Sequence, residues 1–383
     1  MNRRKFLKIA GSSAVILAAG GAGFVATRSP EKALKPWKTA GSLYSDPIRR
    51  ALSYAILAPN PHNRQPWVVD IKSDSEAVLT CDLDRLLPAT DPFSRQIIIG
   101  LGCFVELFSI AAADQGLRAD IEYFPQGEPD SILDQRPIAR LLLSKQSNLQ
   151  RDPLFTQTLQ RHTSREPYNT DRPITDGILQ RLRSISADKV IAGSTNDAAM
   201  LNSLRTLTRD ALHTEIRTPE AFQETIDLMR IGKAEIEANP DGISLGGAFL
   251  ESLSLIGVLS RETLADPTSD SFQIGIDMAT QGAMTSMGFV WINTMGNSRS
   301  AQIEAGRAYM RICLQATADG LVMQPMSQAL QEYKAMAPFY KAVHKQLTSQ
   351  SGERVQMLAR LGFVESSKPA PRWLLETRLK KKG

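Results

Sequence analysis

The segment Arg161–Arg165, with the sequence RHTSR, is the clearest candidate for binding an anion. Its two arginines are four residues apart, and the hydroxyl residue Thr163 lies between them. Each guanidinium offers a fork of N–H donors and the hydroxyl adds another, so the three side chains together suit a phosphate group. Two solvated surface arginines would give the same pattern. The segment alone leaves both interpretations open.

A second segment, APNPHNRQPW at positions 58–67, combines amides and a histidine with three prolines. Proline fixes its own φ angle, so this backbone is stiff. Such a turn could present polar groups to a flat heteroaromatic ligand, with Trp67 packed behind them. A well-packed turn between a helix and a strand, without any ligand, is the alternative. The polar side chains concerned are Asn60, His62, Asn63 and Gln65.

Other binding chemistries lack support. No glycine-rich phosphate loop of the GxGxxG or GxxxxGK[ST] type precedes a helix, which argues against a Rossmann fold or a P-loop. The three cysteines are far apart, and none of the four histidines has the spacing of a metal ligand. We therefore expect no metal site and no disulfide framework. No residue stands out as a catalytic acid or base.

The first part of the chain contains the elements that would position the 58–67 turn. Asp46 before Pro47 predicts the start of a helix that runs to about residue 58. Two strands in a hairpin should follow the turn, because short β-branched segments flank Ser73–Ser75. An apolar helix should then end at Gly116 and lead into two further strands. The predicted ranges are 48–58, 68–71, 77–83, 97–116, 119–124 and 139–144.

The second part of the chain repeats this plan with an insertion. Segments 102–117 and 306–321 have the same length, start with Gly and end in Gly-Leu, 204 positions apart. The helix near Ile48 has a counterpart near Ile178, only 130 positions later, so about 74 residues are inserted between about 200 and 285. We expect an amphipathic helix over 200–228 there. The insertion could cover a pocket at the interface of two related halves, or be a helical addition without that role.

The N-terminus has the composition of an export signal. Residues 1–28 contain five basic residues, no acidic residue and a mildly apolar stretch from Ile9 to Ala26. The pair Arg3-Arg4 resembles the twin-arginine signal, which implies the twin-arginine machinery as a partner and a periplasmic location. An uncleaved membrane anchor is the alternative.

Beyond residue 28 the 40 basic residues balance the 40 acidic ones, which argues against nucleic-acid binding. Residues 29–46 are predicted to be a linker.

Taken together, these motifs resemble the nitroreductase-like FMN flavoprotein family, in particular its Acg-like branch, in which two halves are fused. The resemblance covers about residues 47–376. APNPHNRQPW is similar to the family's APSxxNxQPW turn, and RHTSR to its RxSxR phosphate motif. GLVMQPMSQ at 320–328 and the R-x-G … P-R pattern ending at Arg372 match two later motifs.

The resemblance implies an α+β fold with two halves, 47–150 and 151–383, each with a mostly antiparallel sheet flanked by helices. It implies one FMN per chain. Its phosphate would be bound by Arg161, Thr163, Arg165 and Arg372, and its ring would lie between Asn60, His62, Asn63 and Gln65 on one side and Met323, Gln324, Pro325 and Met326 on the other. The family's acidic residue near the ring is not evident, since Ser327 occupies that neighbourhood.

The function we expect is an exported FMN-dependent oxidoreductase that reduces a nitro group, a quinone or an activated alkene, with small molecules as electron donor and acceptor. Hydride would pass through the flavin, while the protein positions the reactants. A non-catalytic protein that stores FMN under a closed lid is the alternative, because the insertion and the missing acidic residue are compatible with it. A partner-binding protein that has lost its flavin is a third.

Overall fold

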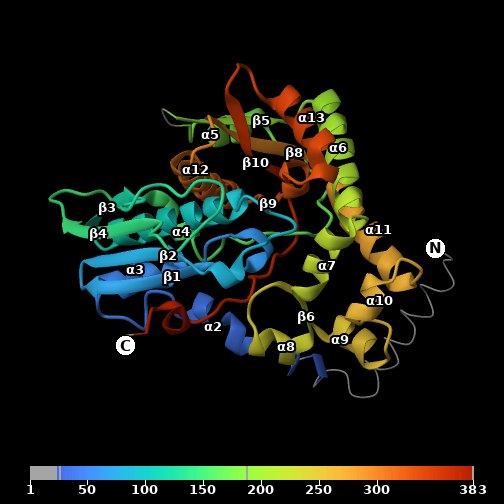
Figure 1. The fold of residues 1–383 in the computed structure, drawn as a ribbon, viewed down its shortest axis with the longest axis horizontal. Helices are drawn as coiled ribbons and strands as arrows, with labels where there is room; N and C mark the ends of the chain where they lie inside the picture. Colours follow the sequence, from blue (N-terminus) through green and yellow to red (C-terminus); the bar gives the residue numbers. More distant parts are fainter. Residues whose placement is uncertain (1–23, 26, 187–188, 382–383) are drawn as a thin grey trace.

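Two antiparallel sheets of four strands each carry the fold (Figure 1). The computed structural model describes residues 24–25, 27–186 and 189–381. The first sheet has the strand order β1-β2-β4-β3 and the second β5-β8-β10-β9, so the same order occurs twice. The strands are β1 Trp67–Ser73, β2 Glu76–Cys81, β3 Leu117–Tyr123, β4 Ala139–Lys145, β5 Val190–Thr195, β8 Gly288–Met295, β9 Val322–Pro325 and β10 Glu353–Gly362.

The α+β class and the elements predicted for the first part of the chain are confirmed. The Asp46 carboxylate accepts a hydrogen bond from the Arg49 amide at 2.9 Å, and Pro47 is the first residue of α3. Burial alternates along β2, as expected for a strand with one face on the core. The flanking helices are α3 Pro47–Ala55, α4 Arg95–Asp114, α5 Asp176–Arg183, α12 Arg299–Ala318 and α13 Ala337–Leu347.

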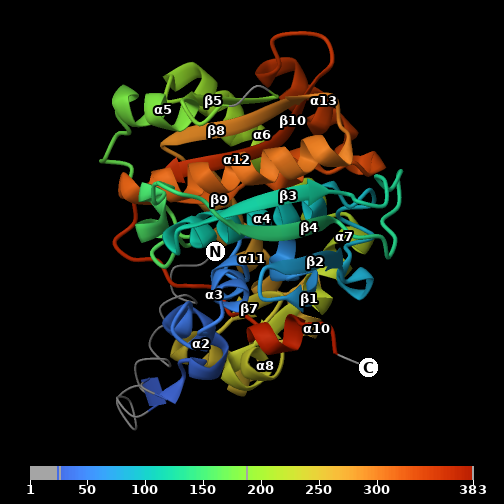
Figure 2. The same ribbon diagram turned by 90° about the vertical axis from the view of Figure 1, so that its left-hand side faces the viewer.

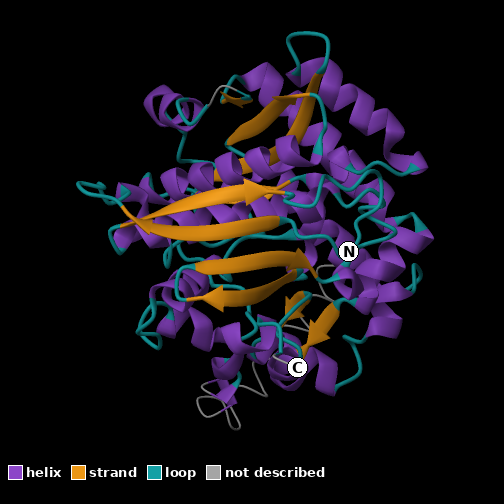
Figure 3. Cartoon of the chain, turned by 60° about the vertical axis from the view of Figure 1, so that its left-hand side comes forward, coloured by secondary structure: helices purple, strands orange, loops and turns teal. Residues whose placement is uncertain are grey.

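Helices α4 and α12 lie against each other between the two sheets, as Figure 2 shows from the side and Figure 3 shows by element type. Their closest approach is at Gly102 and Gly306, the two glycines 204 positions apart. A Cβ atom on either glycine would overlap a backbone carbonyl of the facing helix, at Ile303 or Ile99. The absence of a side chain at both positions is therefore what allows the two backbones to pack this closely.

The first residues of these two helices make reciprocal contacts. Arg95 of α4 donates to the carbonyls of Leu330 and Gln356 in the second part of the chain. Arg299 of α12 donates to the carbonyls of Phe93 and Asp130 in the first part. These arginines are also 204 positions apart, and each bonds the start of its helix to the other part of the chain.

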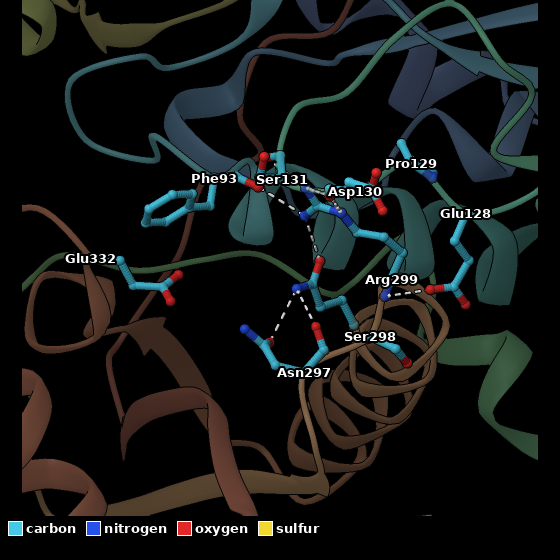
Figure 4. A pocket seen from close by; sticks show the side chains of 10 residues that line it. Phe93, Glu128, Pro129, Asp130, Ser131, Asn297, Ser298, Arg299 and Glu332 are labelled. Carbon is cyan, nitrogen blue, oxygen red and sulfur yellow. Dashed lines mark hydrogen bonds between the residues drawn. The ribbon is translucent and has the colours of Figure 1, made fainter.

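A recess of about 430 Å³ lies at these two helix starts (Figure 4). Glu128 lines it and accepts from the Arg299 and Ser300 amides at the start of α12, while Glu332 pairs with Arg95 at 3.1 Å. All donors of the Arg299 side chain are used by protein acceptors. Arg299, Glu128 and Glu332 at this recess thus all have partners within the protein.

The insertion connects β5 to β8 and lies along one side of the molecule (Figure 1). The single helix expected over 200–228 is wrong, because Thr218-Pro219 ends one helix and starts the next. Two three-residue strands, β6 and β7, pair in parallel within it. Its elements are α6 Ala198–Ile216, α7 Pro219–Asp227, β6 Met229–Ile231, α8 Gly232–Ala238, β7 Ile243–Leu245, α9 Ala248–Leu255, α10 Arg261–Ala265 and α11 Asp270–Met284.

The prediction of a linker at 29–46 also needs correction, because this segment contains helix α2, Glu31–Thr39. Its Trp37 is buried in the main core, and the indole N–H donates to the Ala370 carbonyl at 2.8 Å. The polar composition of this segment concealed one apolar anchor. The short 3₁₀ helices are η1 Pro61–Asn63, η2 Leu83–Arg85, η3 Pro153–Gln157, η4 Ser327–Leu330, η5 Lys334–Met336 and η6 Leu375–Arg378.

One helix among the described residues, α4, is long and apolar enough to cross a membrane. It is mostly buried within the protein, against α12 and α3, which is the situation of a core helix. Most of the predicted export signal lies outside the described residues.

Candidate functional site

The 58–67 turn has an unusual backbone. His62, Asn63 and Gln65 all have positive φ angles, between 46° and 51°. This region is costly for residues other than glycine, and such strain concentrates at binding and catalytic sites. Asn60 holds the turn from inside, because its side-chain oxygen accepts from the Gln65 amide at 2.7 Å and its amide donates to the Ala58 carbonyl. Trp67 is fully buried behind the turn, as expected.

Gln65 fastens this turn to two distant segments. Its side-chain nitrogen donates to the Pro240 carbonyl of the insertion at 2.7 Å, and its oxygen accepts from the Trp373 amide near the C-terminus at 2.9 Å. The side chain is fully buried. Both ends of the amide are used within the protein, so Gln65 positions the turn.

Arg372 closes the turn from the C-terminal segment. Its five N–H donors go to the Asn63 side chain, at 2.6 Å, and to four backbone carbonyls, namely those of Ile56, Leu57, Ala58 and Pro371. Three of these carbonyls follow the end of helix α3, where cations are favoured. Burial, and then the neighbouring charge of Arg161, lowers the pKa of Arg372 to about 9. All N–H donors of the predicted phosphate ligand Arg372 are thus bonded to acceptors of the protein itself.

Arg161 lies near Arg372, but far fewer of its N–H donors have an acceptor. It is 4% exposed, and it donates one hydrogen bond, to the Leu57 carbonyl at 3.3 Å. Its guanidinium carbon lies 5.8 Å from the Trp37 ring centroid, and that of Arg372 lies 5.5 Å away. Within the described residues no carboxylate pairs with either arginine. A buried charge without a counter-ion is costly, so this pair favours an anionic ligand.

His162, between the two phosphate-motif positions, packs against Trp37. The two rings lie edge to face, with centroids 5.2 Å apart, and Nδ1 is 3.2 Å from the Ser367 hydroxyl. Burial, and then the charge of Arg161, lowers its pKa to about 4, so the imidazole is neutral near pH 7. It adds no charge to the arginine pair.

The next residues of the motif run beside β9. Thr163 forms a β-bridge with Met323, and the Ser164 amide donates to the Met323 carbonyl at 3.2 Å. Arg165 has no hydrogen bond or ion pair to any described residue. It keeps exposed surface, yet the surrounding protein lowers the pKa of its guanidinium. Arg165 is therefore an exposed residue whose donors are free for a ligand.

His62 lies close enough to Arg165 for the two to interact electrostatically. Its Nδ1 atom is buried without a partner among the described residues, and Nε2 lies 3.4 Å from the Thr225 hydroxyl of α7. Burial lowers the pKa of His62 to about 4, with a smaller contribution from Arg165 and Arg64. His62 is thus a neutral imidazole with one unused ring nitrogen, next to an unpaired arginine.

The segment 323–326 lies beside the 161–165 segment, through the bridge of Met323 with Thr163. Met323 and Met326 are buried, and Pro325 pairs with Ala359 in the sheet. The Gln324 side-chain oxygen accepts from Arg360 Nε at 2.7 Å. Arg360 is fully buried and also donates to the carbonyls of Gly282 and Glu166. It ties the insertion and the phosphate motif to the end of β9.

The structure therefore brings some of the predicted residues together. Asn63 accepts from Arg372, which interacts electrostatically with Arg161. His62 interacts electrostatically with Arg165, and Thr163 forms a β-bridge with Met323. The sequence did not identify Trp37, Thr225 or the bridging role of Arg360. Trp37 had a signal, as a lone tryptophan in a polar segment, whereas Thr225 had none because only the path of the insertion brings it to His62.

None of the predicted residues lines the two recesses found in the described structure. The first is the one at the starts of α4 and α12. The second, about 590 Å³, is lined by Ala89, residues of α7 and Tyr333–Ala335. Within the described residues, no group of three or more histidine, cysteine or acidic side chains could hold a metal ion.

The chain was compared with family models and with known proteins. No family model matches the chain. An 81-residue stretch is 40% identical to a Mycobacterium tuberculosis protein provisionally named NAD(P)H nitroreductase Acg, which is 21% of this chain and 24% of that protein. The match thus spans about a quarter of the relative. A second protein of that organism, also provisionally named an NAD(P)H nitroreductase, is 24% identical over 84% of this chain and 86% of its own length.

Solved structures give weak matches to the same class. The FMN-dependent nitroreductase NfnB of Mycobacterium smegmatis, in complex with NADPH, is 14% identical, with a TM-score of 0.36 over 58% of this chain and 95% of that chain. A nitroreductase with bound FMN from Desulfitobacterium hafniense is 12% identical, with a TM-score of 0.36 over 61% of this chain and 99% of that chain.

Proposed function

We propose that this protein is an FMN-dependent oxidoreductase of the nitroreductase type. The observation that carries the proposal is the buried Arg161, which has one backbone hydrogen bond and no carboxylate partner among the described residues. An FMN phosphate would supply the missing negative charge. The strained 62–65 backbone and the sequence similarity to nitroreductases along most of the chain support the same function.

The residues present fit an FMN in distinct ways. Arg161 and Arg165 would bind the phosphate with Thr163, whereas Arg372 would hold the 58–67 turn and add positive charge from behind it. His62, neutral and with a free Nδ1, would face the ring, opposite Met323 and Met326. When bound, FMN supplies hydride transfer between a reductant and an acceptor.

The substrate class we propose is a nitro compound, a quinone or an activated alkene. His62 would donate or accept one hydrogen bond at the reacting end of such a molecule without adding charge, because burial keeps the imidazole neutral. Helix α7 would exclude water from this side, since Thr225 contacts His62. We further propose that the repeated strand order reflects two fused halves that share one flavin.

The test is the absorbance spectrum of the full-length protein as purified, followed by stopped-flow mixing with NAD(P)H, a quinol or dithionite. We expect one FMN per chain. Arg161→Ala should weaken FMN binding by about 1.5–3 kcal/mol for each charge-assisted hydrogen bond lost. Arg181→Ala, which removes an exposed partner of Asp319, is the matched control and should retain the flavin.

Each possible result has a distinct meaning. Flavin retention equal to the wild type in Arg161→Ala would refute the phosphate site, provided that both variants unfold at similar temperatures. Flavin that only dithionite bleaches would replace the enzyme with an FMN-storing protein. Protein that neither contains nor binds FMN would refute the proposal.

We also propose that the protein is exported after folding, on the basis of the Arg3-Arg4 leader. An enzyme outside the cytoplasm meets little NAD(P)H, so its donor there would be another small reductant. Replacing Arg3 and Arg4 with lysine should keep the protein in the cytoplasm, because the export machinery requires the arginine pair. Cell fractionation measures this, and unchanged export of the variant would contradict the signal.

A further inference from the structure

Four arginines meet beside the same turn, and none of them is among the candidate flavin-site residues. They come from four separate parts of the chain: Arg64 from the turn, Arg85 from η2, Arg230 from β6 and Arg378 from η6. All four side chains are only 12–15% exposed. The insertion and the C-terminal segment both contribute to this arginine group.

Two carboxylates lie within the arginine group. Asp241 contacts Arg85 at 2.6 Å, Arg230 at 2.9 Å and, more weakly, Arg64 at 3.7 Å. Asp82 contacts Arg85 at 3.0 Å and Arg378 at 3.2 Å. The six side chains therefore carry two positive charges in excess. The nearby Glu235 does not cancel this excess, because it pairs with Arg261.

Donors also exceed acceptors here. The Nε atom of Arg230 and the indole nitrogen of Trp373 are buried, and neither has a partner among the described residues. The Trp373 ring lies beside the group, with its centroid 5.8 Å from the Arg85 guanidinium and 5.7 Å from that of Arg378. Buried donors without acceptors are uncommon and call for an explanation.

The electrostatics agree with an unmet need for negative charge. The pKa of Arg64 is lowered chiefly by burial and further by Arg85 and Arg230. The pKa of Arg378 is lowered by burial and then by Arg85. For Arg64 and Arg378, burial and the neighbouring arginines thus outweigh the favourable effect of Asp82 and Asp241. An added anion would offset this cost.

We propose that this arginine group binds a phosphate group with two negative charges, either free phosphate or a phosphate monoester of a small molecule. Two charges match the excess, and a phosphate offers several acceptor oxygens to forked guanidinium donors and to the free N–H groups. The site is separate from Arg161 and Arg165, although Arg64 and His62 belong to one turn. A ligand here would brace the turn, the insertion and the C-terminal segment against one another.

The experiment is calorimetric titration of the full-length protein, saturated with FMN, with inorganic phosphate at constant ionic strength. We expect one phosphate per chain, no comparable heat from chloride and at least tenfold weaker binding to Arg378→Gln. Asp82→Asn should bind phosphate more tightly, because it raises the excess charge. A purely structural role predicts no such gain. Arg181→Gln is the control and should bind like the wild type.

Further arms separate this site from the flavin site and identify the source of the phosphate. Arg161→Ala should lose FMN yet keep phosphate binding here, whereas Arg378→Gln should do the reverse, so either proposal can fail alone. Tighter binding of adenosine 2′-monophosphate than of inorganic phosphate would indicate that the ligand is a monoester. Equal or weaker binding of adenosine 2′-monophosphate would indicate that the ligand is free phosphate. Absence of phosphate binding, or binding that neither Arg378→Gln nor Asp82→Asn alters, would overturn the proposal.

Discussion

Individual charged residues in this protein differ in how they are compensated. Arg372 is surrounded by carbonyls that use all of its donors, whereas Arg161 beside it has one such contact. Glu215 of α6 is a third case: it is 4% exposed and accepts from Gln331 Nε2 at 2.8 Å, but no cation pairs with it in the described structure. Burial raises the pKa of Glu215 to about 7.

Glu215 makes the stability of the protein depend on pH. Since its pKa is about 4.5 when unfolded and about 7 when folded, the folded state favours the protonated carboxyl. The contribution of Glu215 to the free energy of unfolding is fully present below pH 4.5 and is lost as the pH rises to 7. Glu215→Gln should remove this loss. Urea unfolding should show the variant gaining roughly 3 kcal/mol on the wild type between pH 4.5 and 7. A pH-independent difference would contradict the assignment.

Among the elements, the sequence was most informative where a local signal and the tertiary structure agree. Asp46-Pro47 predicts the start of α3, and the two Gly-to-Gly-Leu segments predict α4 and α12. The sequence is least informative where a contact with a residue distant in the chain determines the structure. The polar composition of residues 29–46 predicts a linker, although Trp37 in α2 lies beside Arg161. Likewise Gln65 is fixed by residues 240 and 373, which only the fold brings to it.

The contact of α4 with α12 gives a prediction about packing. Gly102→Ala should destabilise the protein by about 3 kcal/mol or more, because the new methyl group would overlap the Ile303 carbonyl and force the helices apart. Gly275→Ala in α11 is the matched control, since nothing lies within 4 Å of its Cβ position. The control should gain roughly 0.5–1 kcal/mol from helix propensity. Chemical denaturation measures both, and similar values for the two variants would contradict the proposed overlap.

At the scale of the whole molecule, the insertion and the C-terminal segment complete the site that the two sheets begin. The place of the insertion follows from the repeat in the sequence, whereas the strand order and the contacts of the insertion do not. Glu224 of α7 accepts from the Ala89 and Thr90 amides and from the Thr90 hydroxyl, and so holds the insertion on the first part of the chain. Arg360 holds it on the second part.

Removing the Glu224 contact should open this side of the molecule. Glu224→Ala loses two backbone hydrogen bonds to a carboxylate, so we expect bound flavin to dissociate about tenfold faster or more, and proteases to cleave the insertion sooner. Glu220→Ala, an exposed acid on the same helix, is the control and should behave like the wild type. Flavin fluorescence after dilution gives the rate. Equal rates for Glu224→Ala and Glu220→Ala would show that α7 does not restrain the flavin.

The closing of the turn by Arg372 and Trp373 has a consequence for biosynthesis. Residues 56–65 are translated well before Arg372 and Trp373, which bond to them. A nascent chain can therefore build the first sheet while the surroundings of Arg161 are still incomplete. On the proposed function, a chain that stops before residue 372 should be recovered without bound FMN.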